Sequence, residues 1–106
     1  MYVQIITLQA PMGKAQMLRN FISGEYLPAI REASGFISAN LLEQVDDRDS
    51  AKLIVYWKDQ ASVENAHSTG LLLGTDSGLV AKVPGLRVQR QSYIMQASAE
   101  NMGIKR

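Results

Sequence analysis

Apolar residues along the chain follow two different periods, and these separate predicted strands from predicted helices. Residues 2–9 are mostly apolar and β-branched, which predicts a strand buried on both faces. Residues 13–33 place apolar side chains three and four positions apart, as in an amphipathic helix whose buried stripe is Met17, Leu18, Phe21, Ile22, Ile30 and Ala33. Because Pro28 cannot donate a backbone hydrogen bond to Gly24, we expect this helix to kink or split there.

The rest of the chain predicts a hairpin, a second helix and a last strand. Residues 36–45 and 51–58 are typical of strands, and the polar residues 46–50 between them predict the turn. Asp59 is placed to cap a helix that runs to His67. The remaining predictions are a short helix over 77–82, a strand over 86–96 and a polar tail over 97–106.

This order of elements predicts an α+β fold, namely a ferredoxin-like four-stranded antiparallel sheet with helices on one face. The strands carry apolar residues at both parities, for example Leu41 beside Leu42 and Val55 beside Tyr56. A sheet of this kind would expose an apolar face on the side without helices, and that face needs a cover. The simplest cover is a second copy of the chain, so we expect a homodimer.

Composition narrows the possible functions. The chain has 106 residues and a net charge of +1, which predicts one domain and no nucleic-acid partner. It has no cysteine and one histidine, His67, so it lacks the residues for disulfides, for thiolate catalysis and for the usual zinc sites. We therefore expect neither a metal site nor a cofactor. We find neither a membrane-spanning apolar run nor a signal peptide, and therefore expect a cytoplasmic protein without a membrane partner.

Trp57 and His67 are the leading candidates for chemistry. Strand parity puts Leu53, Val55 and Trp57 on one face of the sheet. If that face lies under the helices, the indole and the imidazole can meet at the mouth of an apolar pocket. The structural alternatives are a core tryptophan at a strand end and a histidine that bonds the last carbonyls of its helix.

The same stretch resembles the antibiotic biosynthesis monooxygenase (ABM) family. The residues that carry the resemblance are Gly35-Phe36 at the start of the second strand, Glu43 near its end, Trp57 at the end of the next strand, and a helix that ends at His67. The resemblance covers about residues 1–96. It implies a dimeric α/β barrel and places Trp57 and His67 at characteristic positions of the family, in or beside the pocket between helices and sheet.

Some members of that family oxidise polycyclic phenols or quinols with O2 and no cofactor, which implies a small aromatic substrate. The protein then supplies a dry pocket, a base and donors for an oxyanion. We predict Trp57 and His67 as catalytic residues and Asn40, Tyr93 and Arg90 as substrate-binding residues. Strand parity also allows Asn40 and Tyr93 to point into the dimer barrel, and Arg90 to be a solvated strand residue.

Two other functions fit the same resemblance. One is a non-catalytic ligand-binding or stress-associated dimer that keeps the pocket but lacks a competent base. The other is haem binding, since a second branch of the family degrades haem with an asparagine on the first strand and a histidine on a later helix. Here Ile6 stands at the first position, and residues 71–85 contain no histidine, so the match to that branch is incomplete.

Overall fold

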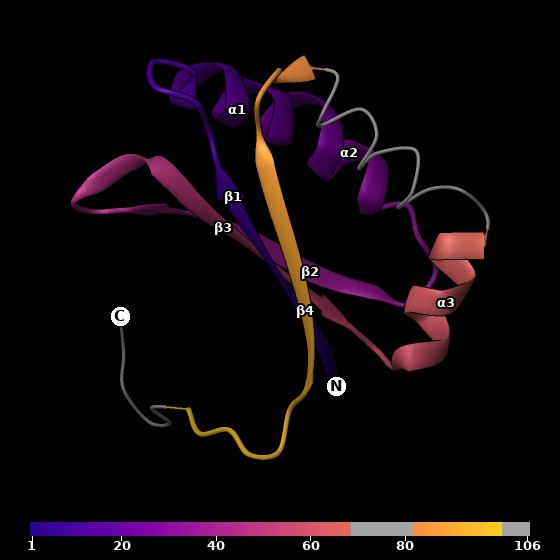
Figure 1. The fold of residues 1–106 in the computed structure, drawn as a ribbon. Coiled ribbons are helices and arrows are strands. Elements are labelled where there is room, and N and C mark those ends of the chain that lie inside the picture. Colours follow the sequence, from indigo (N-terminus) through magenta and orange to yellow (C-terminus); the bar gives the residue numbers. More distant parts are fainter. Residues whose placement is uncertain (69–81, 101–106) are drawn as a thin grey trace.

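The computed structural model describes residues 1–68 and 82–100. In chain order its elements are β1 (Tyr2–Gln9), α1 (Ala15–Phe21), the π-helical segment η1 (Ile22–Tyr26), α2 (Leu27–Ile30), β2 (Phe36–Gln44), β3 (Asp47–Trp57), α3 (Gln60–Ser68) and β4 (Arg87–Ile94). The helical segments α1, η1 and α2 run along one side of the sheet, and α3 follows the end of β3 (Figure 1). The short helix predicted over 77–82 falls almost entirely outside the described residues.

The strands form one antiparallel sheet in the order β2-β3-β1-β4. This is the predicted ferredoxin-like arrangement, which is confirmed. The two strands that pair on both sides are β1 and β3, and they are also the strands richest in buried side chains. The last strand is a little shorter than predicted, because β4 covers Arg87–Ile94.

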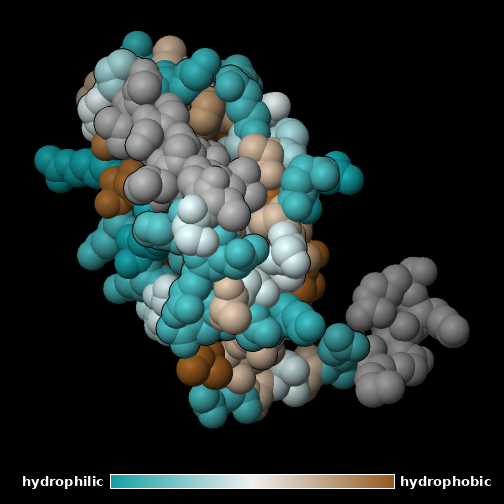
Figure 2. All heavy atoms as spheres, turned by 90° about the vertical axis from the view of Figure 1, so that its right-hand side faces the viewer, coloured by the Kyte–Doolittle hydropathy of each residue, from teal (hydrophilic) through white to brown (hydrophobic). Residues whose placement is uncertain are grey.

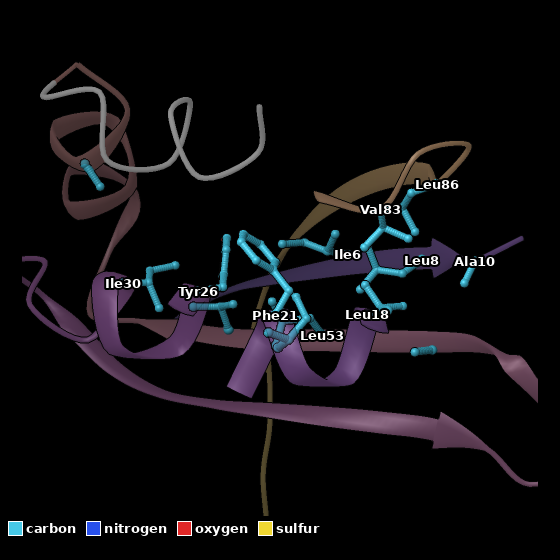
Figure 3. Packing of buried hydrophobic residues seen from close by; sticks show 14 of the residues in the cluster. Ile6, Leu8, Ala10, Leu18, Phe21, Tyr26, Ile30, Leu53, Val83 and Leu86 are labelled. Atoms are coloured by element: carbon cyan, nitrogen blue, oxygen red, sulfur yellow. The ribbon is translucent and has the colours of Figure 1, made fainter. Parts of the chain in front are cut away.

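The hydrophobic core fills the layer between the helices and the sheet. The strands contribute Ile6 and Leu8 from β1 and Leu53 and Val55 from β3, all at most 1% exposed. Side chains of the helical layer point toward them, as do two from the turn before β4 (Figure 3): Leu18, Phe21, Tyr26, Ile30, Val83 and Leu86. The alternate positions of β1 are less covered, since Ile5 is only half-buried, so burial on both faces is incomplete in a single copy.

The first helix is broken by a wider turn, as the proline predicted. The backbone N–H of Leu27 donates to the carbonyl of Ile22, five residues earlier, which is the π-helical pattern. A regular α-helix that buries Leu18 would next bury positions 25 and 29. The buried residues are instead Tyr26 and Ile30, each one position later. The extra residue in the turn therefore keeps the second half of the helix facing the core, whereas Met17, predicted in the stripe, is 42% exposed.

The hairpin is tighter than predicted, because β3 begins at Asp47 and residues 47–50 belong to the strand. The Asp47 carboxylate explains the difference. It accepts hydrogen bonds from the backbone N–H of Asp49 at 3.1 Å and from Ser50 Oγ at 2.8 Å, so the polar side chains satisfy one another within an extended segment. A pairing irregularity between Glu43 and Gln44 leads into the turn.

On the sheet face away from the helices, apolar residues are left uncovered by the helices and strands of the described part of the chain. The positions on this face follow from the ladders and include Ile5, Leu42, Ile54, Tyr56 and Tyr93. Leu42 and Tyr93 are 48% and 47% exposed. Seen from the side of α3, by contrast, the surface is mainly hydrophilic with small separate hydrophobic areas (Figure 2). Within residues 1–68 and 82–100, no helix has the length and apolar character needed to cross a membrane.

Candidate functional site

Trp57 ends β3 on the helix-facing side of the sheet, as strand parity predicted. Its side chain is fully buried, and its indole N–H donates to Gln4 Oε1 at 3.2 Å. The Phe36 ring meets it edge-on, with ring centroids 5.9 Å apart and an interplanar angle of 88°. The indole is thus held on two sides by protein groups.

His67 lies on the exposed side of α3. The residues of this helix that turn toward the sheet are Val63 and Ala66, and Ala66 is 3% exposed. One helical position corresponds to a rotation of about 100°, so the side chain of His67 is turned by about 100° from the sheet-facing direction of Ala66. The predicted meeting of Trp57 and His67 is not seen among the described contacts, because the indole N–H bonds Gln4 instead.

The other three predicted residues divide between the two sheet faces. Asn40 is paired with Ile54, and Tyr93 is paired with Val3, so both face away from the helices. Neither therefore lines the layer between helices and sheet, where a substrate was expected. Arg90 is opposite Ile6 and shares its helix-facing side.

Gln4 is the residue that the sequence reasoning missed. It is 4% exposed and is the one polar side chain buried among the described residues. The available signal was parity, since Gln4 has the same parity as Ile6 and Leu8 in a strand whose helix-facing positions are otherwise apolar. Burying an amide costs free energy unless the amide is hydrogen-bonded. The buried Gln4 beside Trp57 therefore makes this end of the sheet a candidate site.

The start of α3 is fixed by Asp59, the predicted cap. Asp59 Oδ1 accepts hydrogen bonds from Ser62 Oγ at 2.7 Å and from the Ser62 backbone N–H at 2.9 Å. These bonds, the hydroxyl first, lower the pKa of the exposed Asp59 carboxyl from its usual value. Just before the cap, the Lys58 N–H donates to the carbonyl of Gly35 at 2.8 Å, which ties the end of β3 to the start of β2.

A groove of about 430 Å³ opens between α2 and the edge strand β2. It is lined by Ser23, Leu27, Pro28, Arg31, Phe36 and Ala39. Phe36 forms part of this wall and also contacts Trp57, so a molecule in the groove would meet Phe36 before the indole. In the described part of the chain, no group of three or more His, Cys, Asp or Glu side chains is arranged to hold a metal ion.

The helix-facing side of the sheet is therefore apolar, with a few hydrogen-bonding groups near the start of β1. Gln4 and Trp57 are buried there, and Arg90 and Ser92 stand on β4 at the same parity. These side chains are the hydrogen-bonding groups that this side of the sheet offers beside its apolar core.

Comparison with known proteins agrees with this fold. The family model described as antibiotic biosynthesis monooxygenase matches residues 1–73. No curated protein matches the chain.

Three solved structures are similar over nearly the whole chain. A Nitrosomonas europaea protein assigned to the antibiotic biosynthesis monooxygenases has 20% sequence identity and a TM-score of 0.73, over 92% of this chain and 100% of that one. SnoaB of Streptomyces nogalater, a cofactor-independent oxygenase, has 15% identity and a TM-score of 0.75, over 92% and 95%. Rv0793 of Mycobacterium tuberculosis has 17% identity and a TM-score of 0.70, over 94% and 100%. At these identities the likeness concerns the fold.

Proposed function

The chain belongs to the antibiotic biosynthesis monooxygenase family, and from this membership we propose that it oxidises an aromatic phenol or quinol with O2 and without a cofactor. The observation that carries the proposal is the family match over residues 1–73. It is supported by the fold shared with SnoaB, which is itself a cofactor-independent oxygenase.

In the proposed reaction, the substrate supplies the electrons. A deprotonated phenol is electron-rich enough to reduce O2 directly once it is bound away from water. For a phenol with an unsubstituted para carbon, that carbon loses its hydrogen and gains one oxygen atom, the ring becomes a quinone, and the second oxygen atom leaves as water. The protein has to bind the ring, accept the phenol proton and stabilise the oxyanion.

The described residues can meet these needs in part. The apolar walls of the groove between α2 and β2 suit an aromatic ring, and the amide of Gln4 suits an oxyanion. His67 is the single imidazole of the chain, and an imidazole is the side chain best suited to accept a proton near neutral pH. We assign it the role of base, because it is exposed on α3 and can exchange a proton with solvent.

The test is oxygen consumption by the purified protein with a panel of reduced naphthoquinols and polycyclic phenols. We expect uptake above the rate without protein, and a loss of about a hundredfold or more in His67→Ala if it is the base. Val45→Ala, at the 98% exposed hairpin tip, is the control and should keep the rate. If no substrate is oxidised but the same phenols bind saturably, the protein is a non-catalytic binding module.

The uncovered sheet face supports a homodimer as the working state. It holds Ile5, Ile54 and Tyr56 at the centre, where a second sheet can pack face to face. The residues are half-buried in one copy and would become fully buried in two. Asn40 and Tyr93 lie on this face, so in the proposed dimer they contact the partner rather than the substrate.

A further inference from the structure

The groove between α2 and β2 combines apolar walls with a single charged side chain. Four of the six described residues that line it are apolar: Leu27, Pro28, Phe36 and Ala39. The other two are Ser23, which adds a neutral hydroxyl, and Arg31, which carries the charge. The groove volume of about 430 Å³ lies within the range of about 300–1,000 Å³ that is typical of small-molecule sites. Its walls therefore suit an aromatic ring, and its one charge suits an anion.

The two walls of the groove are set by different elements. On the helical side, Arg31 is the C-cap of α2, and its backbone N–H donates to the carbonyl of Leu27 at 3.1 Å. On the strand side, Ala39 is paired with the fully buried Val55 and shares its helix-facing direction. The small side chain of Ala39 leaves room that a larger residue at this position would fill. The groove is thus a consequence of an alanine in β2 opposite the end of α2.

The guanidinium of Arg31 is available to a ligand. It takes part in no ion pair and no side-chain hydrogen bond within residues 1–68 and 82–100. Arg31 is also exposed, so a molecule in the groove can reach it from solvent. Glu32, the acidic residue next to it in the sequence, is not one of the lining residues. No carboxylate of the groove wall therefore competes with an anion for Arg31.

The chemistry of Arg31 selects a carboxylate. A guanidinium presents a planar fork of N–H donors that matches the two oxygens of a carboxylate group. One guanidinium balances one negative charge, whereas a phosphate dianion would leave a second charge against the apolar walls. The apolar walls in turn favour a ligand whose remaining atoms form an aromatic ring, because Phe36 offers a ring on the strand side.

We infer that this groove binds an aromatic carboxylate, with the ring between Leu27 and Phe36 and the carboxylate on Arg31. The inference extends the proposed function, because it makes the substrate a phenol or quinol that also carries a carboxylate group. Arg31 is then a residue that selects the substrate, and it takes no part in the transfer of protons or electrons.

The experiment is isothermal titration calorimetry with 2-naphthoate, which is ionised at neutral pH, and with 2-naphthalenemethanol, which has the same rings and no charge. We expect the naphthoate to bind more tightly. Arg31→Met should weaken naphthoate binding by about fivefold to tenfold, between the effects of an exposed ion pair and of a charged hydrogen bond, and should leave the alcohol unchanged. Arg48→Met is the matched control. It removes a guanidinium that is 76% exposed outside the groove, so both affinities should stay the same.

Two further variants test the charge and the location separately. Arg31→Glu reverses the charge of the groove, so this variant should bind 2-naphthylmethylammonium more tightly than 2-naphthoate, the opposite of the wild type. Ala39→Phe places a ring in the groove and should weaken the binding of both the naphthoate and the alcohol, while circular dichroism shows that the protein remains folded.

Equal affinity of the wild type for the naphthoate and the alcohol would overturn the inference, as would an Arg31→Met variant that binds the naphthoate as well as the wild type does. Absence of naphthoate binding would overturn it too. A changed sedimentation coefficient in Arg31→Glu would then identify the groove as an interface between copies of the chain.

The proposed function can fail independently of this groove. Because 2-naphthoate has no hydroxyl group to oxidise, a protein that binds it through Arg31 but oxidises no phenol would refute the proposed function and leave the carboxylate site standing. Conversely, oxidation of 1,4-dihydroxynaphthalene and of 1,4-dihydroxy-2-naphthoate with the same KM would refute the carboxylate site and leave the proposed function standing.

Discussion

Gly35 offers a direct test of how α3 is fixed on the sheet. Its φ is +84°, and a Cβ at this position would overlap the side chain of Ser62 on α3. Gly13 is the matched control, because its φ is +80° and a Cβ there would have no atom within 4 Å. Gly13→Ala is therefore destabilised by the left-handed backbone conformation alone, whereas Gly35→Ala also forces α3 to move.

The two effects can be estimated separately. An L-residue in the left-handed region destabilises the folded state by about 1–2 kcal/mol. Replacing glycine also makes the unfolded chain less flexible, which offsets roughly 0.4–1 kcal/mol of that loss. We expect Gly13→Ala to lower the free energy of unfolding by about 1 kcal/mol. Forcing extra volume into a packed contact costs about 1–3 kcal/mol more. Gly35→Ala should then lower the free energy of unfolding by about 2–4 kcal/mol.

Urea unfolding at one protein concentration measures both values, provided that the m-values agree. The double variant Gly35→Ala with Ser62→Gly removes the overlapped side chain, so its loss should be smaller than the sum of the two single losses. Equal losses in Gly35→Ala and Gly13→Ala would refute the packing argument, because the backbone cost would then explain both.

Two further predictions concern the dimer and the helix cap. Ile54→Glu places a charge on the uncovered sheet face and should convert a dimer into a monomer in sedimentation velocity, whereas Val45→Glu at the exposed hairpin tip should not; a dimeric Ile54→Glu would contradict the proposed interface. The pKa of Asp59 is lower in the folded protein than in the unfolded chain. Its carboxylate therefore stabilises α3 fully at pH values above the pKa of the unfolded chain, and this effect is lost as the pH falls through the pKa of the folded protein. Asp59→Ala should therefore lower the Tm at pH 7, and this loss should shrink as the pH falls below the ordinary carboxyl pKa of about 3.9. A loss of the same size across that range would contradict the capping role.

The sequence predicted the sheet and the face on which Trp57 lies, because both depend on simple periods. Alternation assigned Leu53, Val55 and Trp57 to one side, and the order of elements left one sheet face without helices. The split helix was also predictable, since Pro28 removes a hydrogen bond whatever the tertiary context. These features are local, or follow directly from local ones.

The features that were missed depend on tertiary contacts. The rotation of α3 is set by which side chains pack on the sheet, and Ala66 rather than His67 turned out to face it. The turn residues Asp47 and Ser50 joined the strand because their side chains bond each other. Gln4 could not be recognised as a partner of Trp57 without the β1–β3 register, which brings residues 53 positions apart into contact.

The π-helical turn of η1 has a consequence for how this chain is aligned with its relatives. It holds one residue more than a regular turn needs, so a relative with an unbroken α-helix brings the same contacts to its core with one residue fewer. Aligned without a gap, such a relative would match Tyr26 to a surface position, and every equivalence on one side of the turn would be off by one. At identities near 20% this error is easily overlooked, and a single-residue gap within residues 22–26 is the correction that the helix geometry calls for.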